Sequence, residues 1–202
     1  FPRLSGIQNL GGEFNKIVNR QIEASTMVIS PLLVAMTVGL PILLPLLFSH
    51  DFLPVIDMMR GSILAMYLRA MTLPMEYIAL SRGDSRHYLL QEAVAALLLV
   101  VAVVAGFHFG GLTATGYALT VASFLEFLFV LVYTYYIYGY RLSRHALLRF
   151  VFQFSLGLIT LAAVFTLKGW PYWVAGALLL AVSIPHKASP FHSSHKGNKK
   201  GE

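Results

Sequence analysis

The fold of this chain is decided by residues 24–48, which read ASTMVISPLLVAMTVGLPILLPLLF. This run holds no ionisable side chain. Its three prolines are tolerated in membrane helices, where neighbouring groups satisfy the freed backbone carbonyls. About 20 helical residues are needed to cross a hydrocarbon core roughly 30 Å thick. The run therefore predicts a membrane-spanning helix.

Further apolar runs follow it along the chain, at 52–80, 88–109, 112–138, 147–167 and 170–184. The last run is short, but the aromatic rings at its start favour the headgroup level of a bilayer. The sequence therefore predicts an all-α integral membrane protein with six transmembrane helices within 24–184. We expect an amphipathic cytoplasmic segment at 1–23 and a disordered, basic cytoplasmic tail at 185–202.

The composition agrees with a membrane protein and excludes several other classes. Of 202 residues, 57% are hydrophobic and only 12% are charged, whereas a soluble domain carries about 25% charged residues. The net charge is +6, but the basic residues are spread along the chain without a nucleic-acid-binding motif, so we expect no nucleic-acid partner. The chain has no cysteine, which excludes a disulfide framework, a thiolate nucleophile and a cysteine-ligated zinc site. We expect neither a metal site nor a cofactor.

Lysine and arginine are distributed unevenly between the connections. Of the 15 basic residues, 12 lie in the leading segment, the second and fourth connections and the tail. Only Lys168 lies in the alternate connections, and Arg60 and Arg69 lie inside a span. Because cytoplasmic loops of membrane proteins hold the excess of basic residues, both ends of this chain are expected on the cytoplasmic side.

Three motifs then suggest a family. They follow one another in a fixed order, as FPRLS at 1–5, ALSRGDSRHY at 79–88 and GGLTATGYALT at 110–120. This order resembles the C-terminal part of O-antigen and polysaccharide flippases, within the multidrug, oligosaccharidyl-lipid and polysaccharide exporter superfamily. In that family a Phe/Tyr-Pro-Arg/Lys-Leu-Ser segment precedes a late helix, a Leu-x-x-Gly turn follows the next one, and small residues open another. The resemblance covers roughly 1–142, and the opening at 113–116 is more polar here than is usual.

The resemblance implies a function. The six spans would be the last six of about fourteen in a two-lobe flippase of the bacterial inner membrane, and a missing N-terminal lobe would be their partner. The substrate would be a polyprenyl-pyrophosphate-linked oligosaccharide for O-antigen, lipopolysaccharide or a related surface polysaccharide. It would cross to the outer leaflet by alternating access, so the protein would be a transporter with no catalytic residues.

Four charged residues inside the predicted spans are the candidate site: Arg60, Arg69, Glu76 and Glu126. Arg60 and Arg69 are nine residues apart, which places them on opposite sides of a helix. Arg69 and Glu76 share a face but are separated by about 10.5 Å along the axis, too far for a direct pair. Arg69 and Glu126 differ by only about 4–5 Å in depth, counted from the outer ends of their spans. We therefore predict an interhelical Arg69–Glu126 pair near mid-membrane.

Several alternatives remain open. The Arg69–Glu126 pair can be a static structural bridge, with Arg60 paired to Asp57 at the i, i+3 spacing. A drug/cation antiporter of the same superfamily is a second transporter class, favoured if the missing lobe holds a buried carboxylate cluster. An integral-membrane glycan-processing enzyme is disfavoured, because such enzymes generally need a large outer loop and the predicted outer connections are only a few residues long.

A cluster of tyrosines lies at the cytoplasmic end of the fourth span, at positions 133, 135, 136, 138 and 140. Tyrosine is enriched where membrane and water meet, so an aromatic belt explains the cluster. A glycan-stacking surface is the functional alternative.

Overall fold

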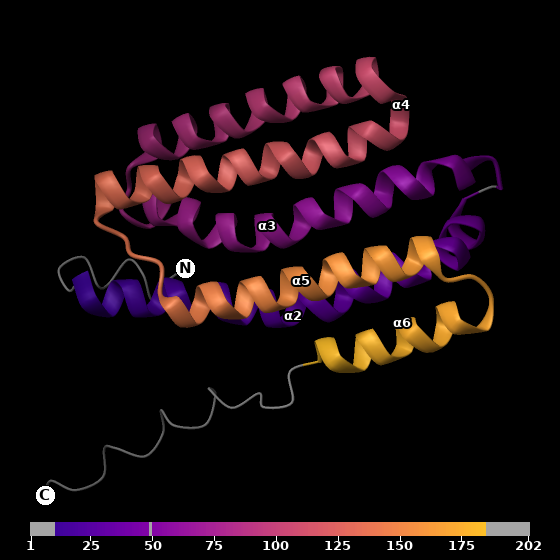
Figure 1. The fold of residues 1–202 in the computed structure, drawn as a ribbon. Coiled ribbons are helices and arrows are strands. Elements are labelled where there is room, and N and C mark those ends of the chain that lie inside the picture. The colour runs from indigo at the N-terminus through magenta and orange to yellow at the C-terminus, as the bar shows by residue number, and fades with distance from the viewer. Residues whose placement is uncertain (1–10, 49, 185–202) are drawn as a thin grey trace, which may run out of the picture.

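The computed structural model describes residues 11–48 and 50–184, and every regular element within them is helical. In chain order the elements are α2 (Gly11–Leu47), the 3-10 helix η1 (His50–Val55), α3 (Ile56–Ser81), α4 (Ser85–Tyr138), α5 (Arg144–Thr166) and α6 (Trp170–Ser183). The helices lie side by side along one common direction (Figure 1). The all-α prediction is therefore confirmed. The segments 1–10 and 185–202 lie outside the described residues.

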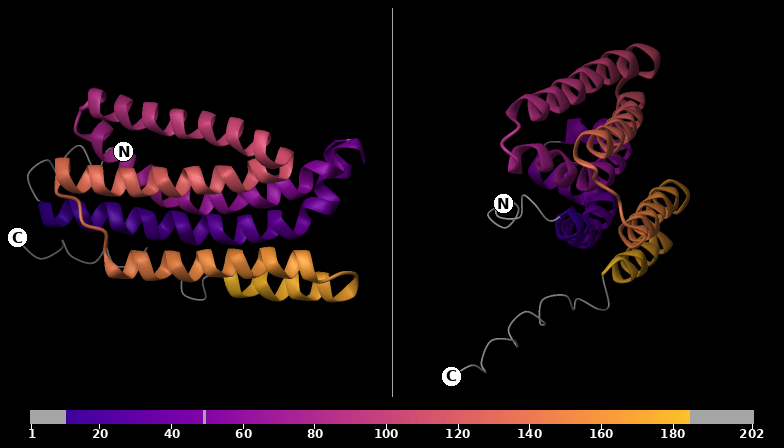
Figure 2. Two further views of the ribbon diagram at one scale, coloured as in Figure 1. Left: turned by 45° about the horizontal axis from the view of Figure 1, so that its top comes forward. Right: turned by 90° about the vertical axis from the view of Figure 1, so that its left-hand side faces the viewer.

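Helix α4 is a hairpin of two helical arms, 85–109 and 112–138, which we call the first and second arm. The break occurs at Gly110 and Gly111, whose backbone angles are not helical, and Gly111 has a φ of 67°. Glycine adopts a positive φ at little cost because it has no Cβ. The two arms run back along each other (Figures 1 and 2). The predicted boundary between the third and fourth spans is thus a real reversal of the chain.

The predicted boundary at residue 23 does not interrupt a helix. Helix α2 runs without a break from the amphipathic segment into the apolar run, with Pro31, Pro41 and Pro45 inside it. The second predicted span begins as the 3-10 helix η1, which contains Pro54, before α3 starts at Ile56.

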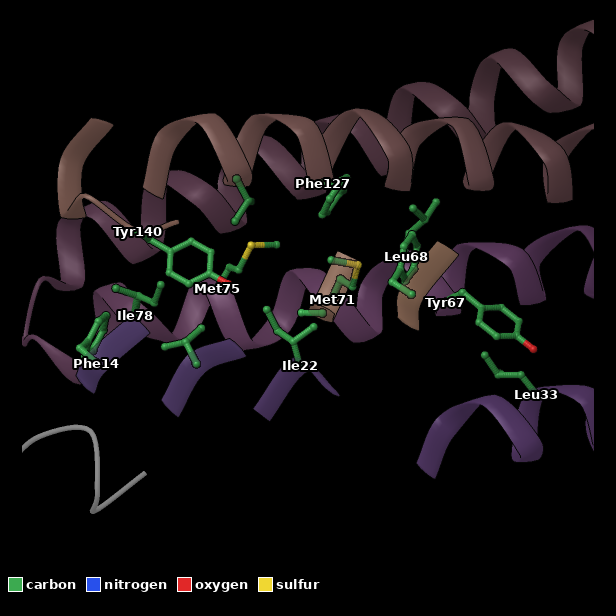
Figure 3. Close-up of a cluster of buried hydrophobic side chains, with 14 residues drawn as sticks. Phe14, Ile22, Leu33, Tyr67, Leu68, Met71, Met75, Ile78, Phe127 and Tyr140 are labelled. Atoms are coloured by element: carbon green, nitrogen blue, oxygen red, sulfur yellow. The ribbon is translucent and has the colours of Figure 1, made fainter. Parts of the chain in front are cut away.

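The hydrophobic core lies where α3 packs against α2, the second arm and α5. Met71, Met75 and Ile78 of α3 are fully buried there. They meet Val18 and Ile22 of α2 and further apolar side chains from α4 and α5 (Figure 3). Helix α3 is therefore held on several sides at once, which fixes the direction in which its charged residues point.

Length and hydropathy indicate a multi-pass membrane protein. Helices α2, α3, α4 and α5 are long and apolar enough to cross a membrane. Each arm of α4 also exceeds about 20 residues, the length needed for one crossing. Helix α6 has 14 residues and so extends about 21 Å, less than the hydrocarbon core. The sixth crossing therefore stays a prediction.

The buried side chain of Asn19 hydrogen-bonds the connection between α4 and α5 to α2. Its amide nitrogen donates to the carbonyls of Asn15 at 2.7 Å and Arg141 at 3.1 Å. Its amide oxygen accepts from the Tyr140 hydroxyl at 2.9 Å and the Ser143 backbone N–H at 2.8 Å. All four hydrogen-bonding positions of the amide are thus used, and the connection is held against the bundle.

Candidate functional site

Arg69 of α3 and Glu126 of the second arm form an ion pair. The guanidinium Nη1 donates to Glu126 Oε1 at 3.0 Å and to Oε2 at 3.2 Å. The Glu126 side chain is 6% exposed and the Arg69 side chain is 32% exposed. The interhelical pair predicted from the depths of the two residues is confirmed as a contact.

Arg69 lies on the one face of α3 that neighbouring helices leave partly open. Between 64 and 80, every residue of α3 is buried except five, at spacings of three and four. We call these five residues the open stripe: Met66, Arg69, Leu73, Tyr77 and Leu80. Such spacings place side chains on one face of a helix. Arg69 is the only ionised side chain in the open stripe, and it projects from an otherwise packed helix.

Glu76 of α3 is buried beside the pair. It is 1% exposed, and neither carboxylate oxygen has a hydrogen-bond partner among the described residues. Its charge interacts with those of Glu126, Arg69 and Glu92. No ion pair joins Glu76 to Arg69, as their axial separation predicted. Glu126 is therefore the carboxyl group that pairs with the Arg69 guanidinium, and the two buried oxygen atoms of Glu76 have no hydrogen-bond donor among the described residues.

The first arm holds two polar residues that sequence reasoning missed, Gln91 and Glu92. Gln91 is completely buried, and neither atom of its amide is hydrogen-bonded within the described part of the chain. Glu92 accepts a hydrogen bond from the Tyr88 hydroxyl at 3.0 Å. Both lie in a span rich in Ala, Leu and Val, where the average hydropathy conceals them. A search for isolated polar residues inside apolar runs could have found them.

Arg60 is not part of this cluster. Its guanidinium lies 3.4 Å from Asp57 and 5.5 Å from the ring centroid of Phe165 in α5. Arg69 instead contacts α4, so the two arginines serve different neighbours, as their helical phase predicted. Nine residues also separate them by about 13.5 Å along α3. The structure therefore brings Arg69, Glu76 and Glu126 together and leaves Arg60 with its sequence-local partner.

Small residues bring α3 and the second arm close together. A Cβ at Gly116 would collide with the backbone of Met58, and one at Gly61 would lie 3.0 Å from the Gly116 carbonyl carbon. The Thr120 hydroxyl also donates to the Gly61 carbonyl at 2.8 Å. Close backbone approach through small residues is typical of packing between membrane helices. This contact fixes the distance between the helices that carry Arg69 and Glu126.

The candidate site consists of charged and hydrogen-bonding side chains. Within 11–48 and 50–184, no three His, Asp or Glu side chains are grouped as ligands for a metal ion. The arrangement can hold an anion at the Arg69 guanidinium or a proton at the buried carboxyl groups. Comparison of the chain with family models, curated proteins and solved structures finds no match, so the flippase family stays an expectation from the sequence motifs.

Proposed function

We propose that the chain belongs to a flippase that moves a polyprenyl-pyrophosphate-linked oligosaccharide to the outer leaflet of a bacterial inner membrane by alternating access. Both ends of this chain would face the cytoplasm, as the distribution of basic residues favours. A second lobe, outside this chain, would complete the transport path. The oligosaccharide would be a unit of O-antigen or a related surface polysaccharide.

One observation carries the proposal, namely that Arg69 projects from the open stripe of a helix packed on its other sides. An arginine at the centre of a membrane helix costs about 2.5–3.5 kcal/mol when it faces lipid. Facing a polar path avoids that cost. The open stripe is therefore the surface of this chain best suited to line a path for an anionic headgroup.

The ion pair supplies a cationic group that can bind a phosphate. Guanidinium groups bind phosphate as well as carboxylate in a bidentate manner, so a pyrophosphate competes with Glu126 for the same donors. Arg69 is 32% exposed while Glu126 is almost buried, so an incoming anion reaches the arginine first. On this account the pair holds Arg69 in position between transport events and opens when substrate arrives.

The test removes the charges without removing the side chains. In cells that carry Arg69→Gln together with Glu126→Gln, we expect folded protein in the membrane, loss of surface polysaccharide and accumulation of lipid-linked oligosaccharide on the cytoplasmic side. The control is Arg149→Gln together with Glu23→Gln. These two residues join α5 to α2 through an ion pair between Arg149 Nη1 and Glu23 Oε2 at 2.7 Å, and the Arg149 side chain is half exposed. Exposed pairs contribute about 0–1 kcal/mol, so this control should transport normally.

The charge swap decides between transport and a structural bridge. A protein with Arg69→Glu and Glu126→Arg keeps an ion pair but moves the cation off the open stripe. We expect it to remain inactive while its thermal unfolding in detergent matches that of the wild type. Transport at the wild-type rate by the swapped or the neutral variant would show that the pair is only structural.

A drug/cation antiporter is the second candidate, and the buried Glu76 favours it. A carboxyl group without a hydrogen-bond partner is suited to exchange a proton or to bind a cationic molecule. Glu76→Gln distinguishes the candidates. If the protein is an antiporter, this substitution should abolish the export of drugs from cells. If the protein is a flippase in which Arg69 alone contacts the substrate, surface polysaccharide should remain in place.

A further inference from the structure

A pocket lies beside the end of the second arm, apart from the Arg69–Glu126 pair. We call it the tyrosine pocket, and its volume is about 390 Å³. Its walls are Leu131, Val132, Tyr135, Tyr136, Tyr140, Arg141 and Leu142. Three of the five tyrosines noted in the sequence, Tyr135, Tyr136 and Tyr140, therefore line this pocket and are not only part of an aromatic belt.

The one cation of the tyrosine pocket is held at a fixed place. Gly139 ends α4 with a φ of 64°, which turns the chain back beside the helix. The Arg141 carbonyl then accepts from Asn19, which pins the backbone of this residue. The Arg141 side chain is exposed, and no carboxylate among the described residues lies within 4.0 Å of its guanidinium. The backbone of Arg141 is thus held in place, while no carboxylate of the described residues neutralises its guanidinium.

Polarity changes along the pocket in the order found in a phospholipid. Leu131 and Val132 form the apolar end, one to two helical turns inside the membrane span. Tyr135 and Tyr136 follow with their rings at 5.5 Å and a steep interplanar angle of 78°. Tyrosine favours the level of the glycerol and headgroups. Arg141 stands at the polar end, where a lipid phosphate would lie.

We propose that the tyrosine pocket binds an anionic phospholipid, with Arg141 contacting its phosphate and the aliphatic wall contacting its acyl chains. Charge complementarity selects an anionic headgroup, because the pocket holds one cation and no acidic side chain. The aliphatic wall selects a lipid over a free anion or a soluble glycan. The site does not depend on the proposed flippase function, since none of its residues belongs to the open stripe.

The test measures lipid binding to the purified protein in neutral detergent. Phosphatidylglycerol and phosphatidylcholine are titrated, and bound lipid is counted by native mass spectrometry. We expect phosphatidylglycerol to bind more tightly to the wild type, and Arg141→Gln to weaken it about fivefold while leaving phosphatidylcholine unchanged. Tyr136→Ala, at a side chain that is 77% exposed, should weaken both lipids.

Arg86→Gln is the matched control. Arg86 is also exposed, lies near the same end of the bundle as Arg141 and is absent from the pocket wall. Its neutralisation should leave phosphatidylglycerol binding within twofold of the wild type. Equal effects of Arg86→Gln and Arg141→Gln would overturn the proposal, because they would reveal only general attraction between opposite charges.

Two compounds that compete with phosphatidylglycerol test whether the tyrosine pocket binds a different ligand. Inorganic phosphate should not displace phosphatidylglycerol, and displacement by it would reduce the site to one for a free anion. A short-chain polyprenyl phosphate should not bind more tightly than phosphatidylglycerol. Tighter binding of that compound would overturn the phospholipid assignment and make the pocket part of a substrate path.

Discussion

Replacing Asn19 by alanine should destabilise the whole bundle, because this buried side chain hydrogen-bonds the α4–α5 connection to α2. The substitution leaves the Tyr140 hydroxyl and the Ser143 N–H without their acceptor. Tyr140 is 1% exposed, so water cannot replace the lost partner there. A buried polar group left unpaired costs about 1–3 kcal/mol. Two such groups, one of them only partly buried, give an expected loss of about 3 kcal/mol.

The measurement is thermal unfolding of the purified protein in mild detergent, with Gln21→Ala as the control. Gln21 is an exposed residue of the same helix. For a chain of this size, about 3 kcal/mol corresponds to a fall of roughly 6–12 °C in Tm. Gln21→Ala should change Tm by less than about 2 °C, since surface substitutions usually stay within about 0.5 kcal/mol.

A second substitution separates the lost hydrogen bond from other effects of Asn19→Ala. Tyr140→Phe removes the hydroxyl that the Asn19→Ala substitution leaves unpaired. It should therefore cost less stability in the Asn19→Ala background than in the wild type, and the difference is the coupling energy of the pair. Equal costs in both backgrounds, or a Tm for Asn19→Ala within 2 °C of the control, would show that Asn19 does not stabilise the bundle through these hydrogen bonds.

Three glycine substitutions test the contact between α3 and α4 and the reversal inside α4, with Gly12→Ala as the control. Gly116→Val should destabilise the protein by about 1–3 kcal/mol, because its side chain would collide with the Met58 backbone. Gly12→Ala, where a Cβ meets nothing within 4 Å, should be neutral or stabilising in the same thermal assay. Gly111→Ala should cost about 1–3 kcal/mol, since this residue has φ 67° and ψ −152°, a region almost reserved for glycine. An unchanged Tm for Gly111→Ala would contradict the hairpin geometry.

Much of the fold could be predicted because each membrane span is determined by residues that are close together in the sequence. The apolar run at 24–48 and the reversal at Gly110–Gly111 depend on residues near one another in the chain. The Arg69–Glu126 pair could be predicted because depth follows from counting residues along rigid helices. The Arg60–Asp57 contact followed from helical spacing alone.

Other features depended on partners far away in the chain. The role of Asn19 is set by a connection more than a hundred residues later, and no local pattern marks it. The open stripe could not be predicted, because apolar residues lie on every face of α3 and only the neighbouring helices decide which of them are covered. Gln91 was missed because its span is dominated by aliphatic residues.

A substrate contact at Arg69 requires that the open stripe of α3 faces a water-accessible path. The chain has no cysteine, so single cysteines can be introduced without removing others. Met66→Cys and Leu73→Cys lie on the open stripe, and Leu97→Cys lies at an exposed position of the first arm, where we expect lipid. Each is treated in inside-out and right-side-out vesicles with a membrane-impermeant thiol reagent.

The two cysteines on the open stripe should react, and the lipid-linked oligosaccharide should slow their reaction. Leu97→Cys should stay unreactive, because a thiol surrounded by hydrocarbon is neither ionised nor reached by a charged reagent. If the cysteines at positions 66 and 73 are as unreactive as the one at 97 in both kinds of vesicle, the open stripe faces lipid or protein, and the account of Arg69 as a substrate contact is wrong.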